Sequence, residues 1–307
     1  MKHLFQIIGS SLGRFSYPVT LFLLCFAGLS LRLVFIFTPG YVYDVQIFRT
    51  WGQEVNKYGI VRSYSSLPTY IEQPNYPPIM MWIWGASVKT EAWFSDQKIT
   101  LPPNLLMKIP AILADLALSI VIFLIISVLV NRPTALIASL LLLCNPAFFI
   151  DSSIWIQNDS IYMLFFVTGL LLFMRNKYLI SGIVLMASIL TKPQSVIFVP
   201  VGIYLIIVMV LTKRMLISDL FKLILGLFTS ALLILHPFII QNKVNIIWNL
   251  YSHSIGYYSK LSMNAFNFWW MAYADKSREI VSKSPFLFGI SYRNFGLLAF
   301  FSYFAKQ

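Results

Sequence analysis

The fold is decided by the contrast between one long polar stretch and the apolar runs around it. The stretch Thr38–Pro78 reads TPGYVYDVQIFRTWGQEVNKYGIVRSYSSLPTYIEQPNYPP, and it follows the apolar run Ser16–Phe37. A run of about 20 mainly apolar residues is long enough to cross a bilayer as a helix. We therefore interpret the polar stretch as the first loop beyond a membrane crossing. Asp44 in this loop is the leading candidate for the centre of any chemistry.

The composition indicates an integral membrane protein. Of the 307 residues, 58% are hydrophobic and 11% are charged, whereas soluble domains carry roughly 25% charged residues. The formal net charge is +12, but the Lys and Arg residues are scattered between apolar runs and form no basic face. This pattern argues against nucleic acid as a partner and favours membrane lipids, in particular their anionic head groups.

We predict an all-α, polytopic membrane protein with about eight transmembrane helices. It is expected to be a single domain over 1–307, with surface-lying helices in a long first extracytoplasmic loop, 38–104, and a second long loop, 241–284. The run Ile79–Val88 is too short to cross and predicts a helix in the membrane interface. The expected spans are Ser16–Phe37, Leu105–Val130, Thr134–Ile150, Ile161–Met174, Tyr178–Leu190, Val196–Leu211, Leu220–Ile240 and Pro285–Phe304.

The distribution of charge predicts the orientation. Lys and Arg in short loops are enriched on the cytoplasmic side of membrane proteins. If the N-terminus is cytoplasmic, eight crossings place Arg132, Arg175, Lys213 and Lys306 on that side. The same count places both long loops outside, together with nine of the eleven acidic residues. The polar, acidic face of the protein is therefore expected to be extracytoplasmic.

Two features of the first loop are candidate functional groups. Asp44 precedes the run Val45–Tyr58, whose apolar residues have helical spacing and predict a helix on the membrane surface. Asp44 could cap this helix or act as a general base at the water–lipid boundary, and the two roles are compatible. Tyr76 precedes Pro77 and Pro78. This turn could simply start the next helix, or it could hold the tyrosine against a sugar or a lipid head group.

A second polar cluster follows the third predicted span. Asp151, Trp155, Gln157 and Asp159 crowd one short loop. The loop could be solvated, with Asp159 capping the next helix and Trp155 in the interfacial aromatic belt. We favour a cluster that binds a sugar by hydrogen bonds and stacking, because these acids have no basic residue nearby in the sequence.

Further candidates lie within or between the predicted spans. Asp115 follows Lys108 by seven residues, about two helical turns. It is either part of a buried structural contact or a functional intramembrane acid. Lys192 and Gln194 interrupt two spans, where the lysine could snorkel to the interface or meet a lipid phosphate. The remaining candidates are the pair Asn264 and Asn267 in an aromatic segment, and Arg293, which could bind a phosphate.

Taken in order, several short motifs resemble integral-membrane glycosyltransferases of the GT-C class. The chain is most similar to mannosyltransferase-like proteins related to the second mannosyltransferase of GPI-anchor synthesis. The matching stretches are Tyr43-Asp44 with Phe48, Trp51 and Gly52; Tyr76-Pro77-Pro78; Lys108 to Asp115; Asn145-Pro146; Trp155 to Ser160; Thr191 to Gln194; and Asn264 to Trp269.

The resemblance implies transfer of a sugar, such as mannose, from a polyprenyl-phosphate donor to a glycan, lipid or protein acceptor, with inversion at the anomeric carbon. It implies that Asp44 deprotonates the acceptor, that Gln157 and Asp159 line the same cavity, and that Lys192 or Arg293 faces the donor phosphate. This chemistry requires no cofactor, although a divalent metal ion is an open alternative. The sequence shows no Cys/His cluster with metal-ligand spacing. The expected location is the bacterial cytoplasmic membrane, with the site on the extracytoplasmic face.

Two departures from the family pattern keep other interpretations open. Family members commonly have Asp in place of Asn75 and Gly in place of Ile156, and they commonly continue with more helices than this chain has. A transporter or flippase of a lipid-linked sugar would be compatible with charged residues within the spans, but the sequence shows no inverted repeat. A truncated relative, or a non-catalytic assembly subunit, is the third interpretation.

Overall fold

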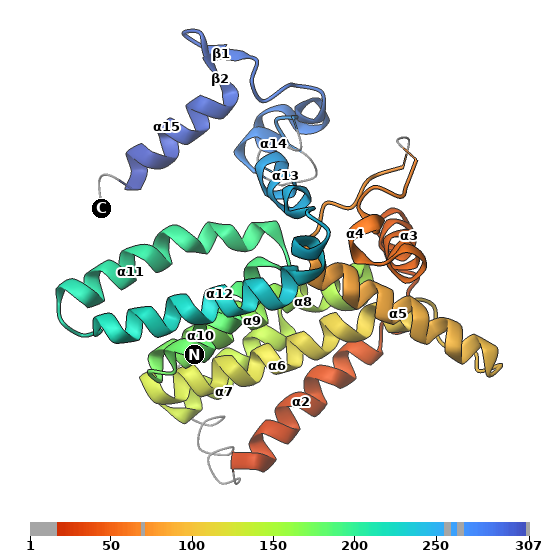
Figure 1. Cartoon of the computed structure of the whole chain (residues 1–307), viewed down its shortest axis with the longest axis horizontal. Coiled ribbons are helices and arrows are strands. Elements are labelled where there is room, and N and C mark those ends of the chain that lie inside the picture. Colours follow the sequence, from red (N-terminus) through yellow and green to blue (C-terminus); the bar gives the residue numbers. More distant parts are fainter. Residues whose placement is uncertain (1–16, 69–70, 255–258, 263–266, 305–307) are drawn as a thin grey trace. The chain divides into compact units, whose positions relative to one another are not determined.

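A computed structural model describes the chain except for residues 1–16, 69–70, 255–258, 263–266 and 305–307 (Figure 1). Within the described residues there are fourteen α-helices and one two-stranded sheet, so the prediction of a helical protein is confirmed apart from a small hairpin. The chain divides into two compact units, Met1–Leu250 and Tyr251–Gln307, which are described separately.

The first unit contains the apolar helices and the first-loop helices. The polar stretch forms the amphipathic helix α3 (Val42–Tyr58) and the short helix α4 (Ile60–Ser63), and α5 (Pro78–Asp96) begins at its end. The other elements are α2 (Tyr17–Leu33), α6 (Leu105–Leu129), α7 (Arg132–Cys144), α8 (Pro146–Ile150), the π-helical turn η1 (Asp151–Trp155), α9 (Asp159–Met174), α10 (Tyr178–Ile189), the 3₁₀ turn η2 (Pro193–Phe198), α11 (Val199–Leu211), α12 (Ile217–Ile240) and α13 (Val244–Ser254), which ends beyond the unit boundary.

The prediction of eight transmembrane helices is wrong. Among the described residues, three helices are long and apolar enough to cross a membrane: Leu105–Leu129, Pro193–Leu211 and Ile217–Ile240. A fourth span results if the pair Arg132–Cys144 and Pro146–Trp155, bent by 44°, is counted as one. The helices α9 and α10 have 16 and 12 residues, because polar segments end them early. The predicted orientation was counted over eight crossings, so the side on which Asp44 lies stays a prediction.

Two further boundaries differ from the sequence expectation. The ten-residue interfacial helix expected over Ile79–Val88 is the first half of α5, which has 19 residues. In the second unit, the span expected over Pro285–Phe304 is a β-hairpin followed by the 13-residue helix α15 (Tyr292–Phe304). The hairpin pairs β1 (Pro285–Leu287) with β2 (Ile290–Ser291), and its turn residues Phe288 and Gly289 both have positive φ, as two-residue hairpin turns require. This unit also contains α14 (Phe268–Tyr273) and η3 (Ala274–Arg278).

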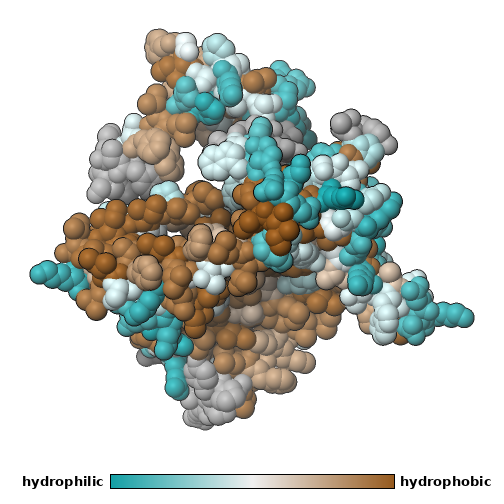
Figure 2. All heavy atoms as spheres, viewed as in Figure 1, coloured by the Kyte–Doolittle hydropathy of each residue, from teal (hydrophilic) through white to brown (hydrophobic). Residues whose placement is uncertain are grey.

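The surface of α11 and α12 is the clearest sign of a lipid environment. Figure 2 shows a broad apolar surface over these two helices. No residue of α11 is buried, and α12 exposes Phe221 and Phe228. Apolar patches of such extent are rare on soluble monomers. A bilayer would cover this surface and explain why so many large apolar side chains face outward.

The packing of α10 against α12 depends on two glycines. These helices run side by side, with α9 on the other side of α10 (Figure 1). A Cβ atom on Gly226 would lie 2.0 Å from the carbonyl oxygen of Leu179, and one on Gly182 would lie 2.2 Å from that of Leu223. Small residues at such crossings let helix backbones approach closely in membranes. Here the contact is backbone to backbone, so no side-chain rotation can relieve it.

We therefore expect Gly226→Ala to lower the free energy of unfolding by about 1–3 kcal/mol, as overpacking does elsewhere. Gly202→Ala is the matched control, because Gly202 lies within α11 and its added Cβ would meet no atom within 4 Å among the described residues. The control should be neutral or slightly stabilising, since alanine favours helix. Thermal unfolding in detergent, followed by tryptophan fluorescence, measures both. Equal effects of the two substitutions would contradict the close crossing.

Candidate functional site

The candidate site is organised around the carboxylate of Asp44. Asp44 lies in the first turn of α3, but the N-cap residue is Tyr41, and no side chain caps the helix. The capping interpretation is therefore wrong. Instead, one oxygen of Asp44, Oδ2, accepts a hydrogen bond of 2.8 Å from Nε1 of Trp155 and one of 2.5 Å from Nε2 of Gln157. The structure thus joins the two polar segments that the sequence singled out, although more than a hundred residues separate them.

The loop before α3 positions this contact through glycine. Gly40 has φ +86°, and a Cβ there would lie 2.4 Å from the side chain of Ile156. The next residue, Tyr41, donates its backbone N–H to the carbonyl of Trp155 over 3.2 Å. The tyrosine ring also packs against the indole, with centroids 5.4 Å apart. Only glycine allows the two segments to approach so closely at this point.

Ile156 is the strained member of this contact. It is fully buried, yet its φ of 73° and ψ of 36° are left-handed. A β-branched residue in this region is a true outlier. The strain is sustained because the isoleucine side chain fills the space over Gly40 and because the backbone of Gln157 donates to the carbonyl of Asp151 over 2.9 Å.

Tyr76 reaches the same place from the end of the first loop. Its hydroxyl donates to Oε1 of Gln157 over 3.4 Å. Its ring packs edge-on against Phe48 and Trp84, at centroid distances of 5.8 and 5.0 Å, in an aromatic cluster between α3 and α5. Burial raises the pKa of Tyr76, so the phenol is protonated at neutral pH and can act as a hydrogen-bond donor.

Lys192 brings a positive charge to the cluster. It is buried, forms an ion pair with Asp159, and lies 5.4 Å from the centroid of the Tyr76 ring. Burial alone would favour the neutral amine, but Tyr76 and the Asp159 carboxylate outweigh it and hold the pKa of Lys192 above its ordinary value. The lysine is therefore an ammonium at neutral pH. The backbone N–H of Ile79 donates to the carbonyl of Leu190 over 3.2 Å, which fixes α5 beside this segment.

These contacts define one continuous polar group, which we call the Asp44 cluster. The contacts above link all of its groups: the carboxylates, the indole, the amide, the phenol and the ammonium. Oδ1 of Asp44 has no hydrogen bond to any described residue and can receive a proton. No group of three or more His, Cys, Asp and Glu side chains in the described part of the chain is arranged to hold a metal ion, and a divalent ion stays an open alternative. The cluster comprises Asp44, Tyr76, Trp155, Gln157, Asp159 and Lys192.

Four other sequence candidates have no hydrogen bond or ion pair to this cluster among the described residues, or lie outside those residues. Gln194 is exposed in η2 and makes no hydrogen bond to a cluster residue within the described structure. Asn267 and Arg293 belong to the second unit, where the side chain of Asn267 caps α14 by accepting from the N–H of Trp270 over 3.0 Å. Asn264 lies outside the described residues. The roles proposed for these residues stay predictions.

Asp115 belongs to a separate, fully buried network. Its partner is Arg32 of α2, with nitrogen–oxygen distances of 2.8 Å from Nε and 2.7 Å from Nη2. Hydroxyls of Ser152 and Ser160 also donate to the carboxylate. Of the two interpretations left open by the sequence, these contacts support the structural one. The sequence analysis missed Arg32, although an arginine within an apolar run requires a buried partner.

Lys108 is a second buried structural cation. Its ammonium donates to the carbonyls of Phe35, Ile36 and Thr38 over 3.0, 3.0 and 2.7 Å. These carbonyls lie just beyond the end of α2, where helix carbonyls lack partners within the helix. Lys108 therefore fixes the chain just before the Gly40 turn, and it forms no hydrogen bond or ion pair with Asp115.

The buried network should affect stability rather than chemistry. We expect Asp115→Asn to lower the free energy of unfolding by about 3–5 kcal/mol, because it leaves the Arg32 charge uncompensated. The double variant Arg32→Met with Asp115→Leu should recover most of that loss, since apolar replacements of buried pairs are often tolerated. Denaturant unfolding of the single and double variants measures the difference. A double variant that is less stable than Asp115→Asn would refute this account.

The close approach of the Gly40 turn to Ile156 can be tested separately. Gly40→Ala introduces both a positive-φ alanine and a clash, whereas Gly59→Ala introduces only the former, since a Cβ on Gly59 meets nothing within 4 Å among the described residues. Positive-φ strain costs about 1–3 kcal/mol at such a position. We expect Gly40→Ala to lower the thermal unfolding midpoint clearly more than Gly59→Ala does. Equal unfolding midpoints of the two variants would show that a Cβ at position 40 does not clash with Ile156.

No model of a known protein family matches this chain, and no curated protein sequence matches it either.

Proposed function

We propose that the protein is a membrane glycosyltransferase that moves a sugar from a polyprenyl-phosphate donor to an acceptor hydroxyl, with Asp44 as the general base. The observation that supports the proposal best is the Asp44 cluster, which sets a carboxylate with one free oxygen near a buried ammonium. It is supported further by the three to four helices of the described residues that are long and apolar enough to span a membrane. The motif resemblance supplies the reaction class, with mannose as the expected sugar.

The proposed reaction uses the carboxylate of Asp44 and the ammonium of Lys192. The acceptor hydroxyl oxygen attacks the anomeric carbon, and its proton passes to Oδ1 of Asp44. The bond between that carbon and the phosphate oxygen breaks, and the phosphate leaves with the electron pair. Attack opposite the leaving group inverts the anomeric configuration. A negatively charged leaving group needs positive charge and hydrogen-bond donors rather than a nucleotide-binding fold.

Lys192 and Tyr76 are suited to the leaving group. An ammonium has three N–H donors, and Asp159 uses one of them. The phenol of Tyr76 lies beside it and has one O–H, which it donates to Gln157 in this structure; turning this O–H to the phosphate would add a neutral donor. Trp155 and Gln157 hold the base by its other oxygen, so that Oδ1 keeps a fixed direction. The exposed indole of Trp155 also offers a face on which a sugar ring can stack.

Membrane placement completes the proposal. The expected partners are the lipid-linked donor, membrane lipids and a glycan, lipid or protein acceptor, in the bacterial cytoplasmic membrane with the site facing outward. The cluster lies at the meeting point of the amphipathic helix α3 and the ends of apolar elements, where a lipid-borne phosphate and an aqueous acceptor could both arrive. Transport of a lipid-linked sugar and a non-catalytic assembly role are the alternatives that an experiment must separate.

The test is a transfer assay with the protein in liposomes. Labelled polyprenyl-phosphate mannose is supplied with a glycolipid and glycan fraction from cell membranes, and labelled product is measured. Asp44→Asn should reduce transfer by about 10²–10⁴-fold, the usual contribution of a general base. Glu54→Gln, a carboxylate change on the same helix and outside the Asp44 cluster, should leave transfer unchanged.

Two results would refute the proposal. Undiminished transfer by a folded Asp44→Asn protein would remove Asp44 as the base. Movement of labelled donor across the bilayer without any glycosidic product would instead favour a transporter. Thermal unfolding of each variant shows whether a lost activity reflects a lost fold.

A further inference from the structure

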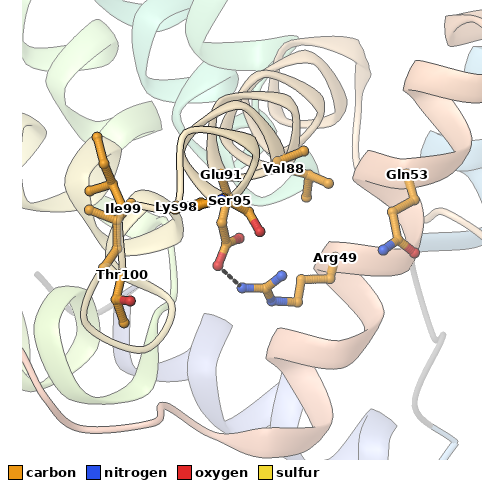
Figure 3. Close-up of a pocket in the computed structure, with 10 residues that line it drawn as sticks. Arg49, Gln53, Val88, Glu91, Ser95, Lys98, Ile99 and Thr100 are labelled. Atoms are coloured by element: carbon orange, nitrogen blue, oxygen red, sulfur yellow. Dashed lines mark hydrogen bonds and ion pairs between the residues drawn. The ribbon is translucent and has the colours of Figure 1, made fainter.

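A pocket lies apart from the Asp44 cluster, between α3 and the C-terminal half of α5. Its volume is about 640 Å³, within the range of small-molecule sites. None of its lining residues belongs to the Asp44 cluster. Its polar side chains come from three segments: α3, α5 and the chain just after α5 (Figure 3). They are Arg49, Gln53, Glu91, Ser95, Lys98 and Thr100.

One wall of the pocket is a fixed ion pair. Nη2 of Arg49 lies 2.6 Å from Oε1 of Glu91, as the dashed line in Figure 3 shows. Nε of Arg49 donates to the side chain of Asn104 over 2.9 Å, and Asn104 in turn donates to the carbonyl of Pro39 over 2.6 Å. The guanidinium is therefore held in place, and Glu91 offsets its charge. Arg49 was not singled out in the sequence analysis.

Lys98 supplies the charge that is not offset. Its ammonium forms no hydrogen bond or ion pair with another side chain in the described part of the chain. Lys98 has φ 59° and follows the end of α5. The N–H of Ile99 donates to the carbonyl of Phe94 over 3.0 Å, and that of Lys98 donates to Ser95 over 2.9 Å. This pattern is a Schellman turn, in which glycine is usual at the position of Lys98. The turn returns the chain toward α5 and brings Lys98 into the pocket wall.

The remaining polar groups define the kind of ligand. The amide of Gln53 and the hydroxyls of Ser95 and Thr100 make no hydrogen bonds to the described residues, so they are available to bind. Together with one unpaired ammonium, they offer a single net positive charge surrounded by neutral donors and acceptors. A phosphate ester that carries hydroxyl groups matches this set, since ammonium groups bind phosphate as point charges and amides bind hydroxyls.

We propose that this pocket binds the phosphate ester of a small polyol, either as a free molecule or as the head group of an anionic lipid. Aliphatic side chains of Val88, Ile99 and Leu101 also line the pocket and can pack against the carbon chain of the ligand. Ile99 is about half exposed, with 47% of its surface accessible, so the rim is open to an approaching molecule. The site is independent of the proposed sugar transfer and does not require it.

The experiment measures binding directly. In one arm, sn-glycerol 3-phosphate is titrated calorimetrically into the purified protein in a non-ionic detergent. In the other arm, the protein in nanodiscs of phosphatidylcholine alone is compared with nanodiscs containing phosphatidylglycerol, with retained lipid counted by mass spectrometry. Lys98→Asn is the test variant, because asparagine tolerates the left-handed backbone and removes the charge. Lys89→Gln is the control: Lys89 is exposed on the same helix and does not line the pocket.

We expect saturable binding in at least one arm. Lys98→Asn should weaken it about tenfold or more, as loss of a charged hydrogen bond does, while Lys89→Gln leaves it unchanged. If the thermal unfolding midpoint of Lys98→Asn is equal to or higher than that of the wild type, the lysine serves binding rather than folding. Binding of the soluble ester identifies a free ligand, and retention of phosphatidylglycerol alone identifies a lipid head group. The absence of binding in both arms, or equal losses in the two variants, would overturn the proposal. Either result is separate from the transfer assay.

Discussion

The two hydrogen bonds to one oxygen of Asp44 are the contacts on which the candidate site depends. They exist because a positive-φ glycine, Gly40, lets the first loop approach Ile156 at close range. A small shift of the Gly40 turn or of the loop at Ile156 would separate the Asp44 carboxylate from Gln157. It would then also lose its link to Tyr76 and Lys192. Buried Lys108 also helps to position the first loop, because its ammonium binds three carbonyls just before Gly40.

The charged groups of the first unit serve two distinct purposes. Arg32 and Asp115 are fully buried and paired with each other, and serine hydroxyls donate to the carboxylate, so they stabilise the packing of α2 against α6 and η1. In the Asp44 cluster, by contrast, the groups keep free hydrogen-bonding capacity: Oδ1 of Asp44 and the remaining N–H groups of Lys192. A fully buried ion pair is a structural feature, whereas a substrate requires hydrogen-bonding groups that are not already used within the protein.

The sequence predicted the helices better than their contacts. Helical periodicity identified α3, and apolar length identified α6 nearly to the residue. Apolar runs did not predict the number of spans, because α9 and α10 are too short and because the chain bends between α7 and the segment after Asn145. The hairpin after Pro285 was missed, since its turn residues Phe288 and Gly289 carry only a weak signal.

The residues of the Asp44 cluster are among those that the sequence singled out, and the resemblance implied that Gln157 and Asp159 line one cavity with Asp44, but the individual contacts were not predicted. Asp44, Trp155, Gln157, Asp159, Tyr76 and Lys192 were all named from polarity within an apolar chain, and the structure joins them. The partner of Asp115 could not be found locally, because Arg32 lies 83 residues away in the sequence. Arg49 was missed for a similar reason: its role depends on Glu91 and Asn104, on other segments.

A structure of the protein in nanodiscs, with a phosphonate analogue of a polyprenyl-phosphate sugar bound, tests the central claim most directly. The account predicts that the phosphonate lies within hydrogen-bond distance of Lys192 and that the anomeric carbon faces Oδ1 of Asp44. An analogue bound elsewhere, with Asp44 and Lys192 facing no part of it, would contradict the account.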